Sequence, residues 1–139
     1  MTFIAACATD DGLLLVDRDF GDSDGYDLYS VEPDGFTFLK RIENTRRNDD
    51  EHTPDGSAAK AGGIGKLLRE HGADVMLANK IGQNITRMRK GFVPVVSRDR
   101  DVHRALENLS RIHDDIVEQI GGSEKSHFIL QKDSSGSPS

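Results

Sequence analysis

The chain has 139 residues and a formal net charge of −6, with 35% hydrophobic and 30% charged residues. A chain of this length can bury about two-thirds of the surface that it exposes when unfolded, so it needs no disulfide or structural metal to fold. The single cysteine, Cys7, excludes an intrachain disulfide and a cysteine-rich zinc or iron–sulfur site. No secretory signal and no membrane-length apolar stretch are visible, so we expect a cytoplasmic protein that does not bind membranes, and the acidic balance argues against nucleic-acid binding.

The first third of the chain is predicted to form short strands joined by turns. Apolar or alternating runs bounded by Asp-Gly and Pro-Asp-Gly turns are typical of β-hairpins. We expect strands at residues 2–8, 13–16, 26–31 and 36–42. In the last of these strands, Phe36, Phe38 and Ile42 are spaced to share one face. The polar residues 43–57 that follow predict a long loop.

The second half of the chain shows helical periodicity that alternates with short apolar runs. We expect helices from about residue 57 to 71, over 81–90 and over 102–120, and strands at 73–78 and 92–96. Pro94 favours an edge position for the last strand, and Gly72 is a helix stop. This order predicts one α/β domain at residues 2–121, with a mixed sheet and helices on both faces. The Ser- and Gly-rich residues 122–139 are predicted to form a flexible tail.

The strongest local signal for binding is the turn Asn79-Lys80-Ile81-Gly82-Gln83-Asn84, which follows a strand and opens a helix. Open α/β sheets bind ligands at the carboxyl ends of their strands. The charge distribution supports this position, because residues 80–104 hold seven Lys and Arg against two Asp, whereas residues 1–39 hold nine Asp and Glu against one Arg. The turn is a candidate anion site, and an ordinary strand–helix turn with a solvated basic helix is the alternative.

Three other features have both a functional and a structural interpretation. Gly62 and Gly63, near the start of a helix, can present backbone amides to an anion or let the helix pack closely on the sheet, or the helix begins only after Gly65. His52, in the long polar loop, is either a metal ligand or a solvated side chain. Cys7, in the first strand, is more typical of a buried core residue than of a ligand.

Several short segments follow a known pattern when they are taken in order. They are Ala8-Thr9-Asp10-Asp11-Gly12, Phe20-Gly21 before Tyr26-Asp27-Leu28-Tyr29, Gly62-Gly63-Ile64-Gly65, His71-Gly72-Ala73-Asp74-Val75-Met76-Leu77-Ala78, Ile81-Gly82-Gln83-Asn84, and Val102 with Ala105-Leu106. In this order and spacing, residues 2–120 resemble the dinitrogenase iron–molybdenum cofactor biosynthesis family.

The resemblance implies a ribonuclease-H-like α/β fold with a five-stranded mixed sheet. The mixed sheet, with helices on its faces, agrees with the topology expected above. It also implies a non-enzymatic carrier or chaperone that binds an iron–sulfur or molybdenum-containing metal cluster, or a precursor of one. Other cofactor-assembly proteins are implied as partners. The cofactor-binding residues would be those of the turn at 79–84, together with Phe20, Gly21, Gly62 and Gly63.

Two departures from the family pattern bear on the chemistry of this site. The family often has a histidine where this chain has Asp19, and its common Gly-Gly before Ile-Gly is here Asn79-Lys80. A carboxylate suits a metal sulfide less well than an imidazole or a thiolate does. We therefore expect Lys80 and nearby amides to hold an anionic cluster electrostatically, with Asp19 and His52 as the candidate metal ligands.

Two further functions are compatible with the sequence. One is an interaction or regulatory module that has lost cluster binding, with Phe128-Ile129-Leu130 in the contact. The other is an enzyme that uses carboxylates around two divalent ions, for which Asp10 and Asp74 are the candidates. The resemblance favours a non-enzymatic carrier over both.

Overall fold

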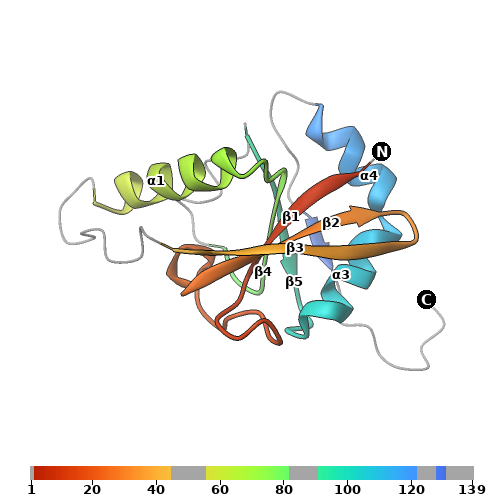
Figure 1. The fold of residues 1–139 in the computed structure, drawn as a ribbon, viewed down its shortest axis with the longest axis horizontal. Helices are drawn as coiled ribbons and strands as arrows, with labels where there is room; N and C mark the ends of the chain where they lie inside the picture. Colours follow the sequence, from red (N-terminus) through yellow and green to blue (C-terminus); the bar gives the residue numbers. More distant parts are fainter. Residues whose placement is uncertain (1, 45–55, 82–90, 122–127, 131–139) are drawn as a thin grey trace.

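The computed structural model describes residues 2–44, 56–81, 91–121 and 128–130 (Figure 1). The strands in this part of the chain are β1 (Phe3–Ala8), β2 (Gly25–Glu32), β3 (Gly35–Glu43), β4 (Val75–Ala78), β5 (Val93–Ser97) and β6 (Phe128–Leu130). The helices are α1 (Gly56–Glu70), α3 (Val102–Arg111) and α4 (His113–Ile120), with a short 3-10 helix, η1 (Phe20–Asp22). The strands form one sheet in the order β3-β2-β1-β4-β5-β6.

The sheet has an antiparallel part and a parallel part. β2 is antiparallel to both β1 and β3, whereas β1, β4, β5 and β6 are parallel to their neighbours in that series. The predicted α/β class with a mixed sheet is confirmed. The predicted number of five strands is wrong, because residues 128–130 pair with β5 as a sixth strand. The sheet therefore extends beyond residue 121, where we expected the domain to end, and the rest of the predicted tail lies outside the described residues.

β5 is an interior strand, contrary to the edge position that Pro94 favoured. Pro94 lies opposite Met76 of β4, and β6 begins opposite the next residue, Val95. The proline, which has no backbone N–H, thus comes before the part of β5 that pairs with β6. Its missing donor costs no hydrogen bond to that strand.

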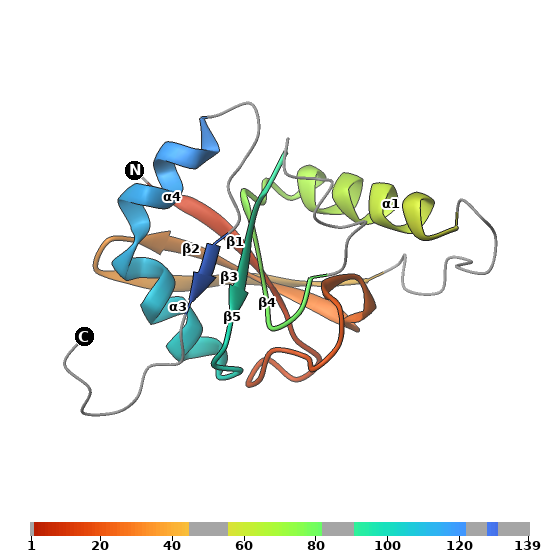
Figure 2. The ribbon, with the colours of Figure 1, turned by 180° about the vertical axis from the view of Figure 1, so that it is seen from behind.

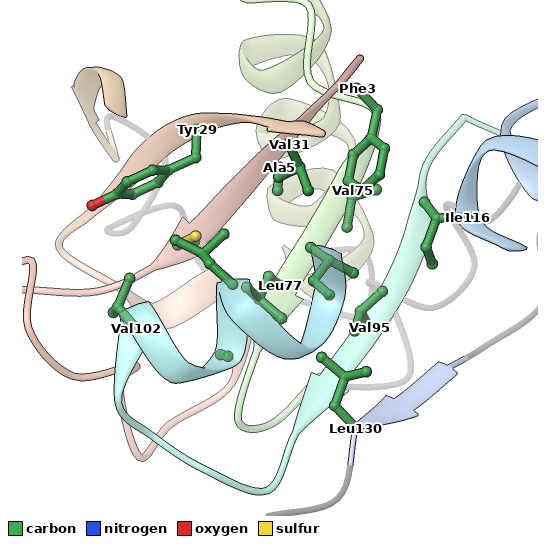
Figure 3. Packing of buried hydrophobic residues seen from close by; sticks show 14 of the residues in the cluster. Phe3, Ala5, Tyr29, Val31, Val75, Leu77, Val95, Val102, Ile116 and Leu130 are labelled. Carbon is green, nitrogen blue, oxygen red and sulfur yellow. The ribbon is translucent and has the colours of Figure 1, made fainter. Parts of the chain in front are cut away.

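Helices cover both faces of the sheet, as predicted (Figures 1 and 2). On one face, Ile64 and Leu68 of α1 pack in a buried cluster with Met76 of β4. On the other face, the apolar stripe of α3 and α4 packs on the central strands, and Figure 3 shows Val102 and Ile116 among the residues of this second cluster. No helix in the described residues is long and apolar enough to cross a bilayer.

A bulge in β3 changes which side chains share a face. Phe38 lies opposite Tyr29 and Lys40 lies opposite Leu28, so Leu39 has no partner in β2. One extra residue reverses the alternation of side chains along a strand. Phe36 therefore packs against the cluster under α3 and α4, whereas Ile42 belongs to the cluster under α1. The prediction that Phe36, Phe38 and Ile42 share one face is wrong for Ile42.

Residues 13–16 do not form the predicted strand. Leu15 makes only an isolated bridge with Thr9, and Leu14 makes one with Asp101, just before α3. The segment is instead a loop that closes over the end of β1, because the Val16 N–H donates to the carbonyl of Ala8. Leu15 and Val16 are buried, whereas Leu13 and Leu14 are exposed.

The predicted helix over residues 102–120 is divided at Ile112. The Ile112 N–H donates to the Leu109 carbonyl at 3.1 Å, which closes the last turn of α3, and its φ of −109° and ψ of 24° interrupt the α-helix. Leu109 and Ile116 still contact the same cluster across the break. The apolar spacing therefore continues through the interruption and does not reveal it.

Candidate functional site

The turn after β4 is attached to both the neighbouring strand and the loop that follows β1. The Asn79 side-chain amide donates to the Ser97 carbonyl at 2.9 Å, which ties the carboxyl ends of β4 and β5 together. The Lys80 carbonyl accepts the Phe20 N–H at 2.9 Å, and Lys80 forms a parallel bridge with Asp19. The structure thus brings together two segments that we singled out separately. Ile81, the next residue, is half-buried against the cluster under α1.

The two departures from the family pattern are neighbours in space. Asp19 and Lys80 are bridge partners, although they are far apart in the sequence. Because β1 and β4 are parallel and adjacent, the segments that leave their carboxyl ends emerge at the same edge of the sheet. Asp19 and Lys80 therefore lie at one place on the surface.

Lys80 is paired with a carboxylate that the sequence analysis did not select. The Lys80 Nζ lies 3.0 Å from Asp17 Oδ1, and 55% and 61% of the two side chains are exposed. The hydrogen bond from Lys80 and then its charge lower the pKa of Asp17 below the ordinary value, and the charge of Arg100 adds to this effect. The positive charge of Lys80 is therefore partly balanced by Asp17. Three of the seven Lys and Arg of residues 80–104, namely Arg87, Arg89 and Lys90, lie outside the described residues.

Phe20 and Gly21 have structural contacts that account for their burial. The Phe20 ring is fully buried and stacks on Tyr26, with 4.7 Å between the ring centroids. The Tyr26 hydroxyl donates to the Phe20 carbonyl at 2.8 Å, and the Asn44 side-chain amide donates to the Gly21 carbonyl at 3.0 Å. The buried ring faces the core, so Phe20 would support a site at Asp19 and Lys80 from below.

The other predicted site residues are not gathered at this turn by the described structure. Gly62 and Gly63 lie well inside α1, which begins at Gly56, so their N–H groups belong to the interior of a helix and not to its free first turn. The expectation that these amides lie at a helix N-terminus is wrong. His52, Gly82, Gln83 and Asn84 fall outside the described residues, and the predictions made for them stay open.

The described residues show no alternative metal centre. No three His, Cys, Asp or Glu side chains in this part of the chain come close enough to hold a metal ion. Cys7 is fully buried, and burial followed by the charge of Asp27 raises the pKa of its thiol far above the ordinary value. A buried thiol that keeps its proton is a poor ligand and a poor nucleophile.

The pair of carboxylates considered for two-metal catalysis is not a pair. Asp10 follows the carboxyl end of β1 and is held by Arg18 at 2.7 Å, whereas Asp74 precedes the amino end of β4. Because β1 and β4 are parallel, these two carboxylates lie at opposite edges of the sheet. They cannot bind the same metal pair.

We expect Asp74 to make the free energy of unfolding depend on pH. Its carboxylate accepts the Ile4 N–H at 3.0 Å, but burial dominates and raises its pKa above the ordinary value of 3.8. An acid that binds its proton more tightly in the folded state makes stability fall as pH rises from the unfolded to the folded pKa. We expect Asp74→Asn, which keeps the acceptor oxygen, to be more stable than the parent at neutral pH by less than about 1 kcal/mol, since the half-exposed carboxylate is screened by water.

Thermal unfolding of the two proteins from acid to neutral pH checks this prediction. The difference in stability should be small in acid and should grow in favour of Asp74→Asn as the pH rises. Asp34→Asn, at the exposed β2–β3 turn, is the control for the loss of one negative charge. A difference that is the same at every pH would contradict the assignment to Asp74.

Asp17 and Arg100 are the members of this region that the sequence analysis missed. Asp17 is one of nine Asp and Glu in residues 1–39, and Arg100 is one of seven Lys and Arg in residues 80–104, so neither stands out in the sequence. The Arg100 Nε donates to the Leu15 carbonyl at 2.8 Å, which places its charge beside the loop that carries Asp17. The predicted strand order could have pointed to them, because segments that follow adjacent parallel strands meet at one edge of a sheet.

This geometry defines a class of protein, namely a mixed α/β domain with a loop and a turn in contact at the carboxyl edge of its parallel strands. The sequence profile described as dinitrogenase iron-molybdenum cofactor matches residues 1–111, which end with α3. The chain belongs to the dinitrogenase iron–molybdenum cofactor family.

The fold also resembles that of a solved structure. The apo form of the orange protein from Desulfovibrio gigas is 19% identical, covers 81% of this chain and 88% of its own, and superposes with a TM-score of 0.50. At this identity the likeness concerns the fold alone. No curated protein matches the chain.

Proposed function

We propose that this protein is a small, cytoplasmic, non-enzymatic carrier that binds an anionic iron–sulfur or molybdenum-containing cluster or its precursor. Family membership supports the general class of cargo. The observation that carries the proposal for the site is the contact between Lys80 and the loop at Asp19 and Phe20, at the carboxyl edge of the parallel strands. Ligands of open α/β sheets bind at this edge.

The proposed mode of binding is electrostatic. Metal sulfides are soft, whereas the carboxylates of Asp17 and Asp19 are hard oxygen ligands, so direct ligation by these side chains is disfavoured. The ammonium group of Lys80 attracts an anion without forming a bond to the metal, and its exposed position leaves it accessible.

We also propose that the fold is ribonuclease-H-like and that other cofactor-assembly proteins are partners. The strand order supports a ribonuclease-H-like fold, since β1 is central and has β2 and β4 on its two sides.

Lys80→Glu is expected to weaken binding by at least about tenfold. The variant removes the attractive charge and places a third carboxylate beside Asp17 and Asp19, and a loss of about 1.4 kcal/mol corresponds to tenfold in affinity. Anaerobic equilibrium dialysis against tetrathiomolybdate, an anionic sulfide of molybdenum, followed by metal analysis and visible absorbance, measures the effect.

The control for this experiment is Lys40→Glu, which makes the same change in net charge at an exposed position. Lys40 lies on the outermost strand, β3, which is separated from β4 by β2 and β1. It should bind like the parent. Equal binding by all three proteins would remove Lys80 from the site. A parent protein that retains no metal from tetrathiomolybdate or from reconstituted iron–sulfur clusters would refute the carrier function itself.

A second candidate function is an interaction module of the same family that has lost its cluster. Asp19 in the place of a histidine and the pairing of Lys80 with Asp17 favour it. The large apolar side chains of Leu13 and Phe38, 68% and 52% exposed, offer contact surface. The predicted contact through residues 128–130 loses support, because Leu130 is buried in the sheet, although Ile129 is 49% exposed. This function requires that the folded parent retains no metal in the dialysis experiment.

A further inference from the structure

We propose that Asp17 is a built-in competitor for Lys80, which lowers the affinity for an anionic cargo and gives Lys80 a replacement partner when the cargo leaves. This inference rests on the proposed carrier function and assigns a regulatory residue to its site. The Lys80 Nζ and Asp17 Oδ1 are 3.0 Å apart, so the ammonium group is already occupied by a carboxylate. An incoming anion must displace that carboxylate before it makes the same contact.

The backbone around the pair is held in place, so exchange of partners needs only side-chain movement. The Phe20 N–H bonds to the Lys80 carbonyl, and the Val16 N–H bonds to the Ala8 carbonyl at 3.0 Å, just before Asp17. The Asp17 and Lys80 side chains are themselves more than half exposed. Exposed ion pairs contribute little to stability and open readily. The ion pair is thus weak enough for an anion to displace Asp17, and Asp17 stays close enough to pair with Lys80 again.

The displaced carboxylate has a second cationic neighbour. Arg100 is near enough for its charge to act on Asp17, and its Nε bond to the Leu15 carbonyl fixes the guanidinium at the base of this loop. Asp17 can turn from Lys80 towards Arg100 and towards water without losing all favourable interactions. The pair is formed in the structure, with 3.0 Å between Lys80 Nζ and Asp17 Oδ1, so the carboxylate competes whenever the site is empty.

Asp17→Asn tests the proposal, because it removes the charge of the competitor and keeps the size of the side chain. We expect the variant to bind tetrathiomolybdate about two- to fivefold more tightly and to release it more slowly, as judged from the strength of exposed ion pairs. Asp34→Asn makes the same change in net charge at the exposed β2–β3 turn and should leave affinity and release unchanged.

A double-mutant cycle with Lys80→Gln separates competition from simple repulsion of the anion by Asp17. If Asp17 acts by occupying Lys80, the gain from Asp17→Asn disappears when Lys80 is already replaced. A gain of the same size in both backgrounds would show repulsion alone and would overturn the proposal. Equal binding by the parent and Asp17→Asn would overturn it as well.

A measurement without cargo distinguishes failure of this inference from failure of the carrier function. Acylation of Lys80 by an amine-reactive reagent, followed by mass spectrometry, should be about two- to fivefold faster in Asp17→Asn than in the parent or in Asp34→Asn, because the ammonium group is no longer held. Unchanged labelling overturns the ion pair and with it the competitor. Faster labelling in Asp17→Asn, combined with no metal bound by any variant, refutes the carrier function and the role of Asp17 in cargo release together.

Discussion

Phe20→Ala is expected to lower the free energy of unfolding by about 3–5 kcal/mol, as truncation of a buried aromatic ring does. The ring is fully buried in the cluster under α1 and stacks on Tyr26 at 4.7 Å. Removing it leaves a cavity beneath η1 and deprives the Tyr26 ring of its stacking partner. The Tyr26 hydroxyl, which donates to the Phe20 carbonyl, would also lose the packing that positions it. Urea denaturation measures the loss as a lower midpoint.

Phe38→Ala is the matched control, because Phe38 undergoes the same truncation with 52% of its surface exposed. We expect its effect on stability to stay within about 0.5 to 1 kcal/mol. If Phe20→Ala were as stable as the parent and failed only in binding tetrathiomolybdate, Phe20 would be a cargo contact and the structural role assigned here would be wrong. A large stability loss with binding restored under stabilising conditions supports that role.

Gly25→Ala is expected to destabilise the protein by about 1–3 kcal/mol, the range for forcing extra atoms into a packed site. A Cβ at this position would lie 2.7 Å from Arg41 Nη2 and 2.8 Å from the backbone carbonyl oxygen of Ile42. The carbonyl belongs to β3 and cannot move without disturbing its pairing with β2. The Arg41 guanidinium donates to the carbonyls of Thr9 and Asp10, so its displacement also loosens the loop after β1.

Gly35→Ala is the control for this substitution. Gly35 also begins a strand, but a Cβ there meets no other atom within 4 Å. Adding the methyl group should therefore change the free energy of unfolding by no more than about 0.5 kcal/mol. The two variants compared by urea denaturation should differ by more than about 1 kcal/mol. Equal stability of the two would contradict the close approach of Arg41 and Ile42 to Gly25.

Most of the local structure could be predicted from the sequence, because it depends on neighbours in the chain. The helix stop at Gly72 is confirmed by its φ of +76°, a conformation that favours glycine. The hairpin between β2 and β3 follows from alternating residues and a Pro-Asp-Gly turn. The predictions that were wrong concern features that depend on contacts between residues distant in the sequence. The bulge at Leu39 and the docking of β6 on β5 have no counterpart in the spacing of apolar residues.

At the candidate site, too, local features could be predicted and contacts between distant segments could not. The α/β class, the position of Lys80 after a strand and the resemblance to the family could all be inferred from the chain alone, because they depend on the order of segments and motifs along it. The folded structure was needed to find that Asp19 bridges Lys80, that Asp17 pairs with the Lys80 ammonium group and that Phe20 is buried in the core. An ion pair between segments that are distant in the sequence depends on side-chain positions of a few ångströms, and no charge count along the chain contains that information.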